Sequence, residues 1–109
     1  MPTKLDAVKQ SKNWNTFFAE TVDEALKQIF KEEGAVVIYD FLEKHASIQL
    51  EDAADKPDIF STSLERLMVS AAHVIEQTIL NKLYSKMGLV FEEKNDYKFS
   101  DYIKELREE

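Results

Sequence analysis

The sequence contains no cysteine, which excludes disulfide bridges, thiolate zinc sites and cysteine nucleophiles. Glycine and proline are also scarce, since the chain has only Gly34, Gly88, Pro2 and Pro57. All-β domains need many tight turns and use these two residue types to make them. The shortage therefore favours helices joined by a few loops, and it excludes a glycine-rich phosphate loop.

Arginine and long apolar runs are scarce as well. Arg66 and Arg107 are the only arginines, and the formal net charge is −7, so nucleic acid is not expected as a partner. The longest apolar run, Ala35–Tyr39, is far shorter than the roughly 20 residues that span a bilayer, so no membrane association is expected. Met1–Gln10 is polar and shows no secretory signal. We expect a cytoplasmic protein.

Hydrophobic residues make up 44% of the 109 residues, which is enough to build one core. We predict a flexible N-terminal segment over residues 1–12 and a single helical domain over residues 13–109. The expected class is all-α, a compact bundle of five or six helices with a short C-terminal β-hairpin as an additional option.

Apolar residues at spacings of three and four predict a first helix that starts near Asn13 or Asn15, either of which could cap it, and that stops at Gly34. The next segment, Ala35–Ala46, is ambiguous. Val36–Tyr39 has the composition of a buried strand, whereas the spacing of apolar residues through His45 is helical and is favoured here.

A second apolar stripe is the longest pattern in the chain. It follows Asp55–Asp58, which has a capping carboxylate and a first-turn proline and so indicates a helix start. The stripe either forms one long helix or breaks near Val69–Ser70, and Gly88 is expected to cap its end. Its members are Phe60, Leu64, Leu67, Met68, Ala71, Ile75, Ile79, Leu83 and Met87.

Two apolar triplets near the C-terminus, Leu89–Phe91 and Tyr97–Phe99, flank a polar stretch and could pair as a short hairpin. Ser100 is then expected to cap a last amphipathic helix, with Phe99 packing against that helix from the preceding position.

Both histidines have structural explanations. His73 and Glu76 lie three residues apart and would share a helix face, but a dimetal carboxylate site needs the order Glu-x-x-His, a second copy and further glutamates. His45 ends the second predicted helix, where a cation suits the helix dipole. We assign neither histidine to a metal site.

Other polar clusters are explained in the same way. Asp52, Asp55 and Asp58 lack the central glycine and terminal glutamate of a calcium loop, and helix capping accounts for them better. Ser61–Ser63 and the nearby Glu65 form no nucleophile motif. The sequence therefore provides no catalytic, cofactor-binding or metal-binding residue, and we expect no enzyme and no cofactor.

The stretches Lys86–Phe91 and Tyr97–Ser100 resemble the wing of a winged-helix domain. This resemblance implies that Ser70–Met87 is a recognition helix. That helix carries Lys82 and Lys86 but also Glu76, which suits the protein-binding variant of the fold better than the DNA-binding one.

Residues 36–106 are also similar to small helical domains of unknown function in archaeal proteins, some of which are output modules of signal-transduction proteins. The similar elements include Lys56–Phe60, Ile75-Glu76 and Asp101–Ile103. The resemblance brings no catalytic residues with it.

Surplus apolar surface on the first helix and the stripe leads to a functional hypothesis. We expect a non-catalytic protein-interaction or regulatory module that binds a protein partner or self-associates as a homodimer. A winged-helix transcription regulator and a small-ligand or metal-binding helical protein are the alternatives.

Overall fold

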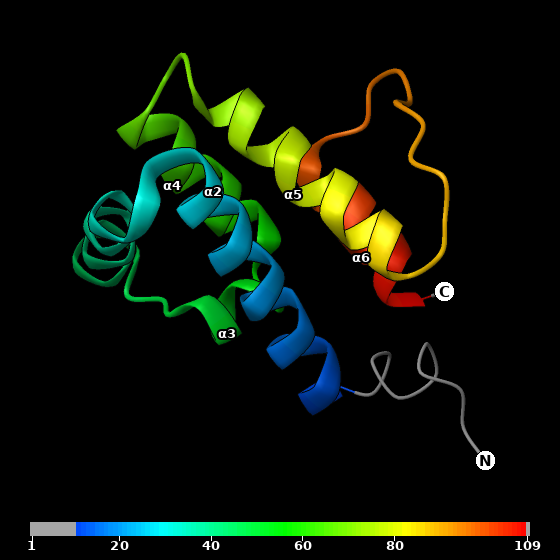
Figure 1. Cartoon of the computed structure of the whole chain (residues 1–109), viewed down its shortest axis with the longest axis horizontal. Helices are drawn as coiled ribbons and strands as arrows, with labels where there is room; N and C mark the ends of the chain where they lie inside the picture. The colour runs from blue at the N-terminus through cyan, green and yellow to red at the C-terminus, as the bar shows by residue number, and fades with distance from the viewer. Residues whose placement is uncertain (1–10, 109) are drawn as a thin grey trace.

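The computed structural model describes residues 11–108, and within this range the chain forms helices and no strand. The all-α prediction is confirmed, and the number of helices lies within the expected range (Figure 1). None of these helices is both long enough and apolar enough to cross a membrane. The five helices of residues 11–108 are α2 (Ser11–Ala46), α3 (Leu50–Ala53), α4 (Pro57–Leu67), α5 (Ala72–Lys86) and α6 (Phe99–Glu108).

Helix α2 begins earlier than expected, so that Ser11 and Lys12 already belong to it. The rest of the N-terminal segment predicted to be flexible, residues 1–10, lies outside the described residues. Neither Asn13 nor Asn15 caps the helix. Instead, the Asn15 amide donates a hydrogen bond of 2.9 Å to Asp55, which connects α2 to the segment before α4.

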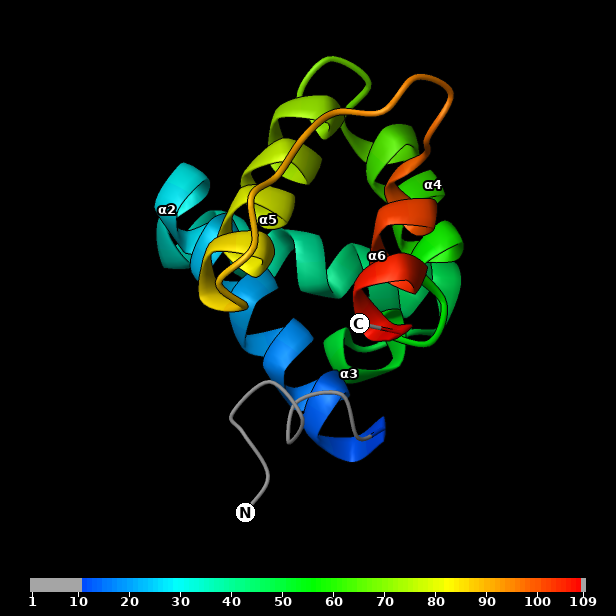
Figure 2. The same cartoon turned by 90° about the vertical axis from the view of Figure 1, so that its right-hand side faces the viewer.

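A sharp bend divides α2 into a first arm, residues 11–30, and a second arm, residues 32–46 (Figures 1 and 2). The bend lies at Lys31, where φ is 62° and ψ is −177°. The prediction that the helix stops at Gly34 is therefore wrong, because Gly34 lies inside the second arm. The helical interpretation of Ala35–Ala46 is confirmed.

The apolar stripe is divided between two helices, α4 and α5, with a turn over residues 68–71. Pro57 occupies the first turn of α4 as predicted, but Asp55 does not cap it, because its carboxylate binds Asn15 and Arg107. Gly88 ends α5 with φ 72°, and the N–H of Leu89 donates to the carbonyl of Tyr84. This is the expected glycine cap.

The helices share one hydrophobic core. A run of aromatic rings crosses it from α2 through α4 to α6. The ring centroids of Phe18 and Phe60 lie 6.1 Å apart, and those of Phe60 and Phe99 lie 5.9 Å apart. Most of the stripe is buried, and its fully enclosed members are Phe60, Leu64, Ile75, Ile79 and Leu83.

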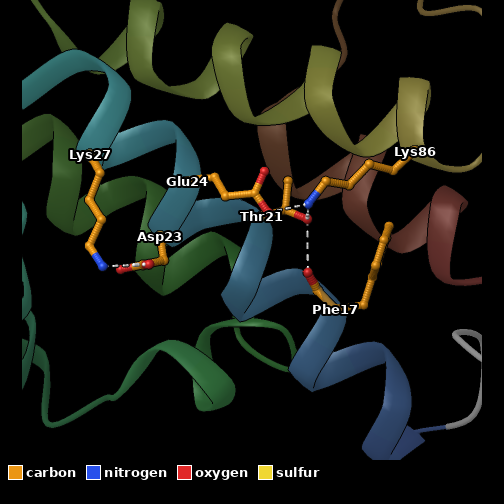
Figure 3. Close-up of polar contacts among 6 residues, drawn as sticks. All are labelled: Phe17, Thr21, Asp23, Glu24, Lys27 and Lys86. Carbon is orange, nitrogen blue, oxygen red and sulfur yellow. Dashed lines mark hydrogen bonds and ion pairs between the residues drawn. The ribbon is translucent and has the colours of Figure 1, made fainter.

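The end of α5 is fastened to the first arm of α2 by Lys86 (Figure 3). Its ammonium group lies 2.6 Å from a carboxylate oxygen of Glu24 and donates to the hydroxyl of Thr21 at 3.2 Å. Thr21 is fully buried and donates in turn to the carbonyl of Phe17. A single lysine therefore connects two segments far apart in the sequence.

The hairpin that was an option for residues 89–99 does not form, because residues 89–98 are a loop without strands. Its path is set by ring contacts to helices, since Phe91 packs against Tyr84 of α5 and Tyr102 of α6 at centroid distances of 5.1 and 5.5 Å. Ser100 does not cap α6 but lies buried in its first turn. The carboxylate of Asp101 accepts the N–H of Lys98 at 2.8 Å instead.

Candidate functional site

His73 and Glu76 share one side of α5, as their spacing predicts, and both line a hollow of about 140 Å³. Glu76 also accepts a hydrogen bond of 2.6 Å from the hydroxyl of Ser61 on α4. Burial raises the pKa of Glu76 and the nearby Glu65 adds to the rise, while the Ser61 hydrogen bond and His73 oppose it. The hydrogen bond between Ser61 and Glu76 therefore connects α4 to α5.

A larger hollow of about 390 Å³ extends from Glu76 to the start of α6. It brings together much of the serine and acidic cluster that the sequence singled out. The lining residues are Asp58, Ser61, Thr62, Glu65, Glu76, Tyr97, Lys98, Phe99 and Ser100. Its lining has three carboxyl groups, one of them half-buried, and one lysine, so the hollow is mainly acidic.

His45 lies at the end of α2, exposed, with its ring stacked on that of Phe41 at a centroid distance of 4.3 Å. It lines a separate hollow with Asp58 and Arg66 of α4. His45 and His73 thus line different hollows, and the structure does not bring them together in either one.

The three aspartates have separate partners. Asp52 accepts the N–H of Gln49 at 3.2 Å, Asp55 binds the Arg107 guanidinium at 2.6 Å, and Asp58 accepts the N–H of Ile59 in the first turn of α4. Over the described part of the chain, no three histidine, aspartate or glutamate side chains gather as metal ligands would.

The second arm of α2 has a surface that the sequence reasoning missed. Val36 and Val37 are 62% and 59% exposed in the middle of this helix. The core side is formed by Ala35, Ile38 and Leu42, and Val37 lies away from it. At 100° per residue, the exposed positions of this arm other than His45 fall within one arc of about 140°. We call this arc the α2 outer face, and it consists of Glu32, Glu33, Val36, Val37, Asp40, Glu43 and Lys44.

The α2 outer face is acidic around its two valines. Four carboxylates lie one or two turns from them, and one of these, Asp40, is paired with Lys44 at 3.1 Å. The sequence signal was present but ambiguous: three β-branched residues in succession, Val36–Ile38, cannot all face the core of a helix. Once this segment is helical, at least one of them must be exposed, and in the structure Val36 and Val37 both are.

A hollow of about 260 Å³ borders this face. Its lining combines the buried side chains of Leu42 and Ile48 with the exposed carboxylates of Glu43 and Glu51. Tyr39 also lines the hollow, and its hydroxyl donates to Asp23 on the first arm of α2. Burial and then this hydrogen bond raise the pKa of Tyr39 far above its usual range.

Comparison with protein-family models, with curated proteins and with solved structures finds no match to this chain. Both resemblances noted in the sequence therefore stay predictions. For the winged-helix resemblance, the residues expected to form the wing have no strand, and Lys86, expected on a recognition helix, is engaged by Glu24.

Proposed function

We propose that this chain is a non-catalytic protein-binding module whose α2 outer face receives a basic, partly apolar segment of a partner protein. One observation carries the proposal: two adjacent valines in mid-helix are mostly exposed and are surrounded by carboxylates. Single exposed apolar residues need no explanation, but neighbouring ones on a polar helix face are typical of a binding surface.

The two parts of the face have different roles. Covering Val36 and Val37 removes apolar surface from water, at about 25 cal/mol per Å². The carboxylates contribute mainly to partner selection and to the association rate, because they attract a cationic partner and repel an anionic one. Together they favour a helix or strand that alternates lysine or arginine with aliphatic residues.

The hollow beside Tyr39 fits one side chain of such a partner. A lysine or arginine can lay its aliphatic stem on Leu42 and Ile48 while its charged group stays near water. Glu43 and Glu51 line the same hollow and would lie beside that charge. The proposal thus assigns a basic anchor residue to this position.

Three synthetic peptides of equal length test the proposal. The first has an amphipathic lysine–leucine pattern, the second replaces each lysine with glutamate, and the third replaces each leucine with serine. Titration of the isotope-labelled protein, followed by backbone NMR shifts, should move signals within residues 32–51 for the first peptide only. The shifts should weaken with added salt. Equal shifts with the glutamate peptide, or shifts confined to other residues, would contradict the proposal.

A second candidate function is small-ligand binding in the hollow around Glu76. The half-buried carboxyl with a raised pKa favours it, because such groups gather at binding sites. Thermal-shift measurements with small amines and amides test this alternative, and Glu76→Gln should abolish any shift.

A cytoplasmic location is part of the main proposal, since a cysteine-free chain suits a reducing compartment.

A further inference from the structure

The bend in α2 holds a lysine in a backbone conformation that is nearly restricted to glycine. At φ 62° and ψ −177°, the Cβ of Lys31 is crowded by the neighbouring backbone. Both arms beside it are regular helix. The unstrained alternative for Lys31 is therefore the helical conformation, which would join the two arms into one straight helix.

Only the bent form of α2 requires the absence of a side chain at Gly34. A Cβ added to it would lie 2.3 Å from the Cβ of Phe30, a separation that real side chains essentially never show. In a continuous helix, the Cβ atoms of residues four apart are separated by about 5–6 Å, so a side chain at this position would fit. The bent form therefore needs glycine at position 34, and the straight form does not.

The contacts that hold the first arm in place can be supplied by any copy of the chain. Phe18 packs on Phe60, and Glu24 pairs with Lys86 at 2.6 Å. Straightening α2 separates these partners within one chain. Two straightened chains can restore them by each inserting its first arm into the other, so the closed monomer and the exchanged dimer share every contact except those at the hinge.

We infer that the chain forms a homodimer by exchanging the first arms of α2, residues 11–30, between two copies that straighten at Lys31. Each dimer relieves the strain at two hinges, and this relief offsets the entropy lost on association. Protein concentration then selects the form. The α2 outer face belongs to the second arm and takes no part in the exchange, so this inference does not depend on the proposed function.

Refolding at different concentrations tests the exchange. The full chain is unfolded in guanidinium and refolded at low micromolar and at near-millimolar concentration, and mass is measured by size-exclusion chromatography with light scattering. Wild-type protein should give monomer at low and dimer at high concentration. Gly34→Ala should shift the dimer to lower concentration. Lys31→Gly should raise the dimer dissociation constant at least about tenfold. The substitution removes the backbone strain that dimer formation would otherwise relieve in both chains.

A crosslink distinguishes exchange from ordinary association. In the cysteine-free chain, Glu24→Cys and Lys86→Cys place two thiols at positions whose side chains pair between the first arm and α5. A short bismaleimide should join two chains in the dimer fraction and only one chain in the monomer fraction, as read by denaturing electrophoresis. A dimer linked only within chains would overturn the inference, and so would wild-type protein that stays monomeric at every concentration. The wild-type result stands even if Gly34→Ala does not fold.

Discussion

Gly34 and Phe30 approach each other so closely that a methyl group on Gly34 would lie 2.3 Å from the Cβ of Phe30. The approach exists because the chain turns at Lys31, between them, rather than at the glycine. The strained residue and the residue that permits close packing are therefore different residues, and each can be changed separately.

Gly34→Ala should lower the free energy of unfolding of the monomer by about 1–3 kcal/mol, the usual cost of overpacking. Urea denaturation at low protein concentration measures the change. Gly88→Ala is the matched control, because Gly88 has φ 72° and open space around its added Cβ. It should cost about 1 kcal/mol through conformation alone. A neutral Gly34→Ala would show that the two residues do not meet in solution.

Lys31→Gly should stabilise the monomer by about 1 kcal/mol. Relief of a backbone strain of about 1–3 kcal/mol outweighs the roughly 0.5–1 kcal/mol that glycine costs in entropy. Gln28→Gly, at an exposed position inside the first arm, should instead destabilise by about 0.5–1 kcal/mol. If both substitutions destabilise equally when measured by urea denaturation, then Lys31 is not strained.

Thr21→Val should cost about 1 kcal/mol, because the buried hydroxyl bonds both the Phe17 carbonyl and the Lys86 ammonium group. Thr78→Val removes a similar bond to the carbonyl of Val74 at a more exposed position and should cost less. A double-mutant cycle with Lys86→Met should show coupling of about 0.5 kcal/mol or more for Thr21. Additive effects would mean that Lys86 and Thr21 do not interact.

Local sequence signals predicted the elements whose boundaries depend on nearby residues. Pro57 and Gly88 bracket the stripe as expected, and Leu64 and Ile79 lie in the core. The bend of α2 escaped prediction, because a glycine in a sequence can indicate either a positive φ or a close approach. Here Gly34 lies in close contact with Phe30, while the positive φ is at Lys31.

The points that the sequence left open were decided by tertiary contacts. The segment 89–99 has strand-like triplets, but Phe91 packs on Tyr84 and Tyr102, so the loop is held by helices rather than by a paired strand. The α2 outer face could be recognised only after the ambiguous segment was known to be helical. Before that, Val36 and Val37 were indistinguishable from core residues.

Glu76→Gln should gain stability relative to wild type as the pH rises. Burial raises the pKa of Glu76, so the folded state holds this proton more tightly than the unfolded state. Wild-type protein therefore loses stability as the pH rises from the ordinary glutamate pKa of 4.5 through the raised value, whereas glutamine carries no such penalty.

Urea midpoints of the two proteins, compared from about pH 3 to about pH 8, measure this difference. Glu92→Gln, which removes the same charge from an exposed loop position, is the control. A difference that favours wild type increasingly with pH would show that Glu76 is stabilised as the carboxylate.

The α2 outer face is tested most directly by isothermal titration of the lysine–leucine peptide into a valine double variant. Val36→Asp with Val37→Asp replaces both exposed apolar side chains and adds negative charge, so electrostatic attraction alone would strengthen binding. The matched control is Val69→Asp with Val90→Asp, which changes valines that are 84% and 81% exposed elsewhere. We predict binding about tenfold weaker for the first pair and unchanged for the second. Equal affinity for wild type and the Val36/Val37 variant would contradict the account.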